Sequence, residues 1–303
     1  MAYPTLRLNK NWHVSGALQF RTRPFFAEEL TMQGYGAELD VIQAYVGYER
    51  FWGTRNYFSF KAGQLTSAFG SFLLRYDDDA NPLIDVPLSY GYYYAPVTTL
   101  GLPGAQADLV LGRFDLRAQF TNSSPANRRG LFDSDQYGGW TGGAGYTIIQ
   151  GLRVGVSTVR GPYLHRESRF FFPGESRPKD LLSTGYGLDV EFARGHWNLR
   201  AEWQRFHNEY DAIPAFNQRT GYAEAKYAFH PRWYVAARTN HARNSRRASQ
   251  DLYEVVVGYR PNRRQLLKLG YQKGRGQRDG VPLAAVLGAQ LVTQIGGIGA
   301  VWD

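Results

Sequence analysis

The feature that most constrains this chain is a strict alternation of apolar and polar side chains with a period of two residues. Residues 197–206, WNLRAEWQRF, show it plainly: Trp197, Leu199, Ala201 and Trp203 alternate with Asn198, Arg200, Glu202 and Gln204. Successive side chains of a β-strand point to opposite faces. The pattern therefore predicts a strand with one face in an apolar medium and the other face in a polar one.

The same alternation recurs along the whole chain and predicts about 15 strands, each near the ~9–11 residues that a tilted strand needs to cross a bilayer. Short turns alternate with longer connections rich in Pro, Asp, Asn, Arg and Gly. These longer connections lie near 24–35, 70–103, 124–137, 163–183, 210–218, 243–250 and 276–285. Short turns at one end and long loops at the other are the layout of an outer-membrane barrel.

The sequence thus predicts a single all-β domain over residues 1–303, a transmembrane antiparallel β-barrel of about 15–16 strands with short periplasmic turns and long extracellular loops. Closed barrels made of one bacterial chain have an even number of strands. An odd count means that one strand is miscounted or that one N-terminal strand precedes Met1, and the second reading is the simpler expectation. Interfacial tryptophans are expected near the turn end, namely Trp12, Trp52, Trp140, Trp197, Trp233 and Trp302.

Charged residues are concentrated on the polar parity of the strands. The basic residues of this parity that are candidates for lining a pore are Lys61, Arg117, Arg153, Arg200, Lys226, Arg238, Arg260 and Lys268. Each unpaired ion in a dry core would cost several kcal/mol, so we expect this face to line water and the apolar face to meet lipid. One interpretation is an electrostatic filter that sets ion preference. The other is cross-strand pairing that only completes the barrel wall.

The longest connection, residues 71–103, is the best candidate for a constriction of the lumen. A segment of this length without regular structure is either functional or disordered, and this one is too apolar to be freely solvated. We expect it to pack inside the barrel and to project Arg75, Asp77, Asp78, Asp79 and Asp85 into the pore. The three consecutive aspartates have the oxygen ligands that a divalent cation prefers. A solvated acidic loop is the commoner outcome, so no metal site is predicted.

The chain is basic, with a net charge of +9 and 35 Lys and Arg residues, of which 29 are Arg. Such a balance fits a nucleic-acid binder, an anion channel or a protein that touches anionic lipid. With the barrel pattern, the expected partners are outer-membrane lipid, including lipopolysaccharide, and small hydrophilic or anionic solutes, and no nucleic acid. The arginines expected on extracellular loops, where they are solvated or contact lipid phosphates, are Arg128, Arg129, Arg166, Arg169, Arg177, Arg243, Arg246, Arg247, Arg275 and Arg278.

Catalytic signatures are lacking in the sequence. The six histidines do not have HExxH spacing, and there is neither a GxSxG elbow nor a Walker loop. The chain has no cysteine, which removes disulfides and thiolate metal sites. We expect no cofactor and no enzymatic activity. Two alternatives stay open: a barrel enzyme acting on lipid or ester substrates, because such triads are recognised by geometry, and a soluble all-β binding protein.

Residues 60–70, FKAGQLTSAFG, resemble the entry to the pore-constricting loop of the phosphate-selective porin family, in which a GQ-x-x-x-x-F-G run precedes that loop. Residues 101–127 resemble the hairpin that follows it. The resemblance implies a sixteen-stranded porin, usually a trimer, that conducts anions. Taken together, these features predict a weakly anion-preferring diffusion porin in the outer membrane of a Gram-negative-type bacterium. The resemblance implies that it assembles as a homotrimer.

Overall fold

The computed structural model is built almost entirely of β-strands. It describes residues 2–21, 38–72, 80–90, 101–123, 137–164, 177–211, 214–245, 249–278, 281–282 and 285–293. The strands are β1 (Thr5–Arg7), β2 (Trp12–Arg21), β3 (Glu38–Trp52), β4 (Asn56–Leu65), β5 (Leu102–Leu111), β6 (Phe114–Thr121), β7 (Gly139–Ile149), β8 (Leu152–Pro162), β9 (Leu182–Arg194), β10 (Trp197–Asn208), β11 (Phe216–His230), β12 (Trp233–Asn244), β13 (Ser249–Asn262), β14 (Gln265–Arg275), β15 (Gln277–Arg278), β16 (Val281–Pro282) and β17 (Ala285–Thr293). One 3-10 turn, η2 (Leu88–Tyr90), follows β4.

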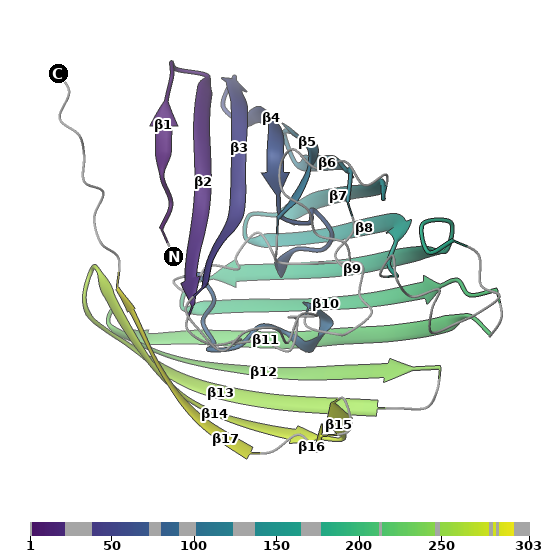
Figure 1. Ribbon diagram of the computed structural model, residues 1–303. Helices are drawn as coiled ribbons and strands as arrows, with labels where there is room; N and C mark the ends of the chain where they lie inside the picture. Colours follow the sequence, from purple (N-terminus) through teal and green to yellow (C-terminus); the bar gives the residue numbers. More distant parts are fainter. Residues whose placement is uncertain are drawn as a thin grey trace.

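Fifteen strands form one antiparallel sheet in sequence order from β1 to β14, with β17 last. The sheet curls around an interior, as Figure 1 shows from the purple β1 to the yellow β17. In the described residues β1 and β17 are the two edges of the sheet. The predicted all-β antiparallel barrel with about 15 strands is thereby confirmed. No helix in the described ranges is long and apolar enough to span a membrane.

Connection lengths follow the expected division into a turn end and a loop end. At the turn end, tight hairpins join the strands, and Gly112 and Gly195 adopt positive φ angles of 63° and 59° there. A side chain other than glycine is disfavoured in that region.

Two connections at the loop end differ from the prediction. The segment expected at 243–250 shrinks to residues 245–248, so that Arg243 lies on β12 and not on a loop. The segment 276–285 contains the small hairpin of β15 and β16.

The two faces of the sheet differ as the alternation predicts. Along β10 the odd-numbered residues are mostly exposed and the even-numbered residues are increasingly buried towards the loop end. Exposed aromatic side chains form a belt at the turn end. Its cross-strand pairs include Trp12–Tyr48, Phe51–Tyr57, Phe114–Tyr146, Trp197–Tyr227 and Trp233–Tyr259. Such belts mark the interface between the apolar and aqueous layers of a membrane.

The placement of Trp140 at the turn end was wrong. Strand β7 starts at Gly139 after a long connection, so Trp140 lies at the loop end, where its ring is 4.7 Å from that of Phe120. Which end a residue occupies depends on the direction of its strand, and this was misassigned. Trp302 lies outside the described residues.

Candidate functional site

The inner segment, residues 80–90, packs on the inner face of strands β10–β14. Figure 1 shows the chain after β4 crossing the interior in front of β10 and β11. Three apolar contacts anchor this region. They are Phe69, Phe72 and Tyr90 with Phe206 and Tyr222; Leu83 with Tyr234, Ala236, Val256 and Leu266; and Leu88 with Ala242 and Leu252. Because these wall residues share the polar parity of their strands, this face is the interior and the opposite parity is the outer surface.

Lys268 on β14 binds the backbone of the inner segment. Its Nζ donates hydrogen bonds to the carbonyl oxygens of Asn81, at 2.8 Å, and Leu83, at 3.0 Å. The whole residue is 0% exposed. A buried ammonium group is costly unless it is fully hydrogen-bonded, so the two carbonyls and the lysine hold each other in place.

Glu254 and Arg238 bind the same segment one step further along. The Glu254 carboxylate accepts hydrogen bonds from the backbone amides of Ile84, at 3.0 Å, and Asp85, at 3.2 Å. Arg238 donates to the carbonyl oxygen of Asp85 and forms a 2.7 Å ion pair with Glu254. The wall thus contributes both a donor and an acceptor to the backbone of residues 84–85.

Tyr90 makes a second polar contact between the inner segment and the wall. The Tyr90 hydroxyl donates a 2.5 Å hydrogen bond to Glu202, which also accepts a hydrogen bond from Gln204 at 2.9 Å. Burial, and after it the charge of Glu202, raise the pKa of the Tyr90 phenol well above its ordinary value. Tyr90 therefore stays protonated at neutral pH and can keep donating to the carboxylate.

Gly70 fits against this contact only because it lacks a side chain. Its φ angle is +72°, and a Cβ there would lie 2.0 Å from both Glu202 Oε1 and the Tyr90 hydroxyl. We expect Gly70→Ala to destabilise the fold by about 1–3 kcal/mol more than Gly112→Ala, because only the first substitution overpacks the interior. Gly112 has a similar φ of +63° with nothing within 4 Å of its Cβ position. Chemical unfolding in detergent measures both; equal losses would mean that the backbone angle alone matters.

A ladder of alternating charges runs around the inner wall through strands β5–β13. Its ion pairs are Arg117–Asp108 at 2.6 Å, Arg153–Asp115 and Arg153–Asp189 at 2.6 Å, Arg200–Glu224 and Arg238–Glu224 at 3.4 Å, and Arg238–Glu254 at 2.7 Å. The Arg153 side chain is 28% exposed and that of Arg238 is 0% exposed. The ladder therefore has a water-facing half on β5–β9 and a half on β12–β13 that the inner segment covers.

The expected pore residues fall into three groups. Arg75, Asp77, Asp78 and Asp79 lie outside the described residues. Lys61, Arg117, Arg153, Arg200, Lys226 and Arg260 lie on the strands and are partly exposed. Arg238 and Lys268 bind the backbone of the inner segment, and Asp85 is part of that segment.

The placement of Arg238 and Lys268 differs from the expected water-lined position. Both are covered by residues 80–90, and their hydrogen-bonding groups bind that backbone. Asp85 is also engaged, since its Oδ1 accepts from the amide of Val86 at 2.8 Å. Selectivity roles for the remaining pore residues stay predictions.

Sequence reasoning missed the residues that receive the inner segment. Glu202 was placed on the polar parity of its strand but not singled out. Neither Glu254 nor Asn240, which accepts a 3.2 Å hydrogen bond from the amide of Leu88, was among the predicted site residues. The signal available for all three was their polar parity, and Glu254 additionally has Arg238 at the opposite position of the neighbouring strand.

Known proteins were compared with the chain at the level of sequence and of structure. No family model and no curated protein matches it. Similar solved structures include Salmonella typhi OmpF in complex with daunomycin (TM-score 0.65, 12% identity, 96% of this chain and 88% of that one), an anion-selective porin from Comamonas acidovorans (0.61, 10%, 96% and 82%) and the outer membrane channel DcaP of Acinetobacter baumannii (0.60, 13%, 95% and 81%). The chain has the fold of outer-membrane porins. These comparisons do not confirm the resemblance to the phosphate-selective porin family.

Proposed function

We propose that the protein is a diffusion porin of the outer membrane, in which water fills the barrel and the inner segment narrows it. The carrying observation is the partly exposed charge ladder on the inner face of β5–β9, opposite an apolar outer face. Ion pairs such as Arg117–Asp108 and Arg153–Asp115 stay hydrated in a water-filled lumen and so avoid the desolvation cost of a dry core. The short turns of the barrel would face the periplasm and the long loops the cell exterior, as in other outer-membrane barrels.

Weak anion preference is the finer part of this proposal. All four arginines of the ladder have a carboxylate within ion-pair distance, which cancels much of their field at a distance. Lys61 on β4 instead lies over the ring of Tyr45, with Nζ 5.5 Å from the centroid. Its positive charge is therefore available to attract small anions into the channel. A homotrimer and passage of small hydrophilic or anionic solutes belong to the same proposal.

Transport is proposed here in preference to catalysis. The one histidine–carboxylate ion pair within hydrogen-bonding distance in the described part of the chain is His241 with Asp251, at 2.7 Å, and it lies on the outer face. Within the described residues no serine or threonine hydroxyl bonds to the other ring nitrogen of His241, a contact that an activated nucleophile needs.

Planar bilayers test the proposal directly. The purified protein should produce stepwise conductance, and its reversal potential in a salt gradient should have the sign of a slight anion preference. Lys61→Gln should move that potential towards cation preference, because it removes a lumen charge. Lys273→Gln is the control, since Lys273 is exposed on the outer parity of β14. A protein that inserts without ever conducting would refute the channel, whereas an unchanged potential in the Lys61 variant would refute only the role of that residue.

A further inference from the structure

Three arginines form a row on the outer face of the barrel. Arg205 on β10 lies opposite Arg219 on β11, which lies opposite Arg243 on β12. All three are exposed, and across the described residues none has a carboxylate partner. Directly opposed side chains have Cβ atoms about 4.5–5.5 Å apart, and like charges at that distance destabilise a sheet. The row therefore favours an anion supplied from outside the chain.

The row lies at the loop-side edge of the apolar band. Trp197 belongs to the aromatic belt at the turn end, and Arg205 follows it on the same strand eight residues later. At ~3.3 Å per residue this is about 26 Å along the strand, and a tilt of about 40° reduces it to roughly 20 Å across the membrane. An apolar band is about 25 Å tall, so the backbone of the row lies about 5 Å inside its loop-side edge. Long arginine side chains extend their charged ends over such a distance towards water, which brings the guanidinium groups to the level of lipid head groups.

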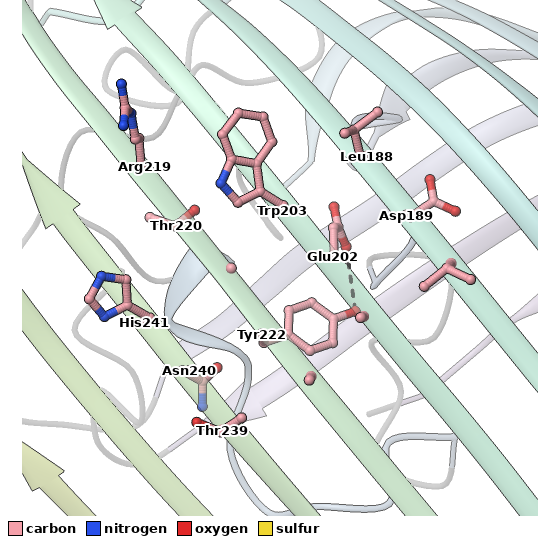
Figure 2. Close-up of a pocket in the computed structure, with 14 residues that line it drawn as sticks. Leu188, Asp189, Glu202, Trp203, Arg219, Thr220, Tyr222, Thr239, Asn240 and His241 are labelled. Carbon is pink, nitrogen blue, oxygen red and sulfur yellow. Dashed lines mark hydrogen bonds between the residues drawn. The ribbon is translucent and has the colours of Figure 1, made fainter.

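An apolar groove begins directly below this row. It encloses about 520 Å³ on the outer face, and its lining includes Leu188, Ala201, Trp203, Arg219 and Ala223. Figure 2 shows Trp203 and Arg219 side by side on neighbouring strands, with His241 on the next strand. Leu188 and Trp203 are exposed, while Ala201 and Ala223, which lie opposite each other, leave the space between larger side chains.

We propose that this surface binds a phosphorylated lipid of the outer leaflet, with phosphate on the arginine row and an acyl chain in the groove. Guanidinium groups bind phosphate oxygens through paired, charge-assisted hydrogen bonds, and basic residues near the membrane attract anionic lipids. Charge complementarity favours a lipid over a second copy of this chain, whose net charge is +9. The nearby carboxylate of Asp251 is already paired with His241.

Native mass spectrometry of the full chain in detergent micelles, titrated with diphosphoryl lipid A, tests the site. We expect the combined variant Arg205→Gln, Arg219→Gln, Arg243→Gln to bind at least about tenfold more weakly, because it loses every charge-assisted hydrogen bond of the row. The matched control is Arg232→Gln, Arg263→Gln, Arg264→Gln, which removes three exposed charges at the turn end and should bind as the wild type does. Heat-modifiable migration on gels verifies that each variant is folded.

Three further measurements separate the lipid from other occupants. Ala223→Leu should weaken binding by filling the groove without touching the arginines, and lipid A stripped of both phosphates should bind as weakly as the triple variant. Inorganic phosphate at equal concentration should not compete. Equal binding to the triple variant and the wild type would overturn the proposal. So would full competition by inorganic phosphate, or spectra in which a second copy of the chain, and not lipid, is lost with the arginines.

Discussion

Arg238→Met is expected to destabilise the folded barrel by about 3–5 kcal/mol, because removing one partner of a buried ion pair leaves the buried Glu254 carboxylate without a cation. Arg238 lies between Glu224, at 3.4 Å, and Glu254, at 2.7 Å. Both glutamate side chains are almost fully buried. Methionine preserves much of the volume of the side chain, so the loss would come from charge and hydrogen bonding and not from a cavity.

Chemical unfolding in detergent or in lipid vesicles, followed by tryptophan fluorescence, measures this difference. The matched control is Arg200→Met on β10, which removes the same group from the same ladder. Arg200 keeps a side-chain exposure of 15% and has one ion pair, with Glu224 at 3.4 Å. Glu224 keeps its ion pair with Arg238 when Arg200 is removed, and Arg200 itself is partly accessible to water, so the Arg200 variant should lose clearly less stability than the Arg238 variant.

A second substitution separates charge from packing. Adding Glu254→Gln to Arg238→Met removes the carboxylate that has lost its ion-pair partner, whereas Glu224 keeps Arg200, and should recover part of the lost stability. The neutral amide retains an oxygen that can accept from the backbone amides of Ile84 and Asp85. If the double variant is as unstable as the sum of the single ones, or if Arg200→Met costs as much as Arg238→Met, burial of the ion pair is not the cause.

Most of the fold could be predicted from the sequence because a period of two residues encodes it directly. The alternation predicted about 15 strands and a long connection at 70–103, and the structure has 15 strands in one sheet with that connection between β4 and β5. Trp140, which was expected at the turn end and lies at the loop end, shows the limit of periodicity. Periodicity defines a strand and its two faces, but the end at which a residue lies depends on counting every strand before it.

The candidate site was predicted less completely, for a different physical reason. Parity places Arg117 and Lys268 on the same inner face, yet the first is partly exposed and the second is completely covered. What separates them is the path of residues 80–90, which depends on apolar contacts made more than 100 positions away in the sequence. The arginine row on the outer face was missed in the same way, since Arg205, Arg219 and Arg243 become neighbours only through strand register.

The attachment of the inner segment provides the second large effect that we expect, in Lys268→Met. This substitution leaves the carbonyl oxygens of Asn81 and Leu83 without their charged donor. Hydrogen bonds to charged groups contribute about 1.5–3 kcal/mol each. A net loss of about 3 kcal/mol would increase the population with a detached segment roughly 100-fold, since each 1.4 kcal/mol is a factor of ten.

The absence of cysteine in the chain makes this population measurable. Ser89 lies in η2 and is 0% exposed, so Ser89→Cys introduces a unique thiol that reacts only when the segment leaves the wall. In the Lys268→Met background, the labelling rate with a water-soluble thiol reagent should rise roughly 100-fold, in proportion to the detached population. Transitions to a higher conductance level should become more frequent as well, because the same segment narrows the lumen.

Lys273→Met is the control for this experiment, because it makes the same substitution on the same strand but on the outer parity, where the side chain is exposed. It should change neither labelling nor conductance. Faster labelling without more frequent high-conductance transitions would mean that residues 80–90 detach but do not limit the flow. Unchanged labelling would mean that the apolar contacts of Leu83 and Leu88 hold the segment without Lys268. The buried ammonium group of Lys268 would then contribute nothing to holding the segment. Its two short hydrogen bonds to the carbonyl oxygens of Asn81 and Leu83 argue against this outcome.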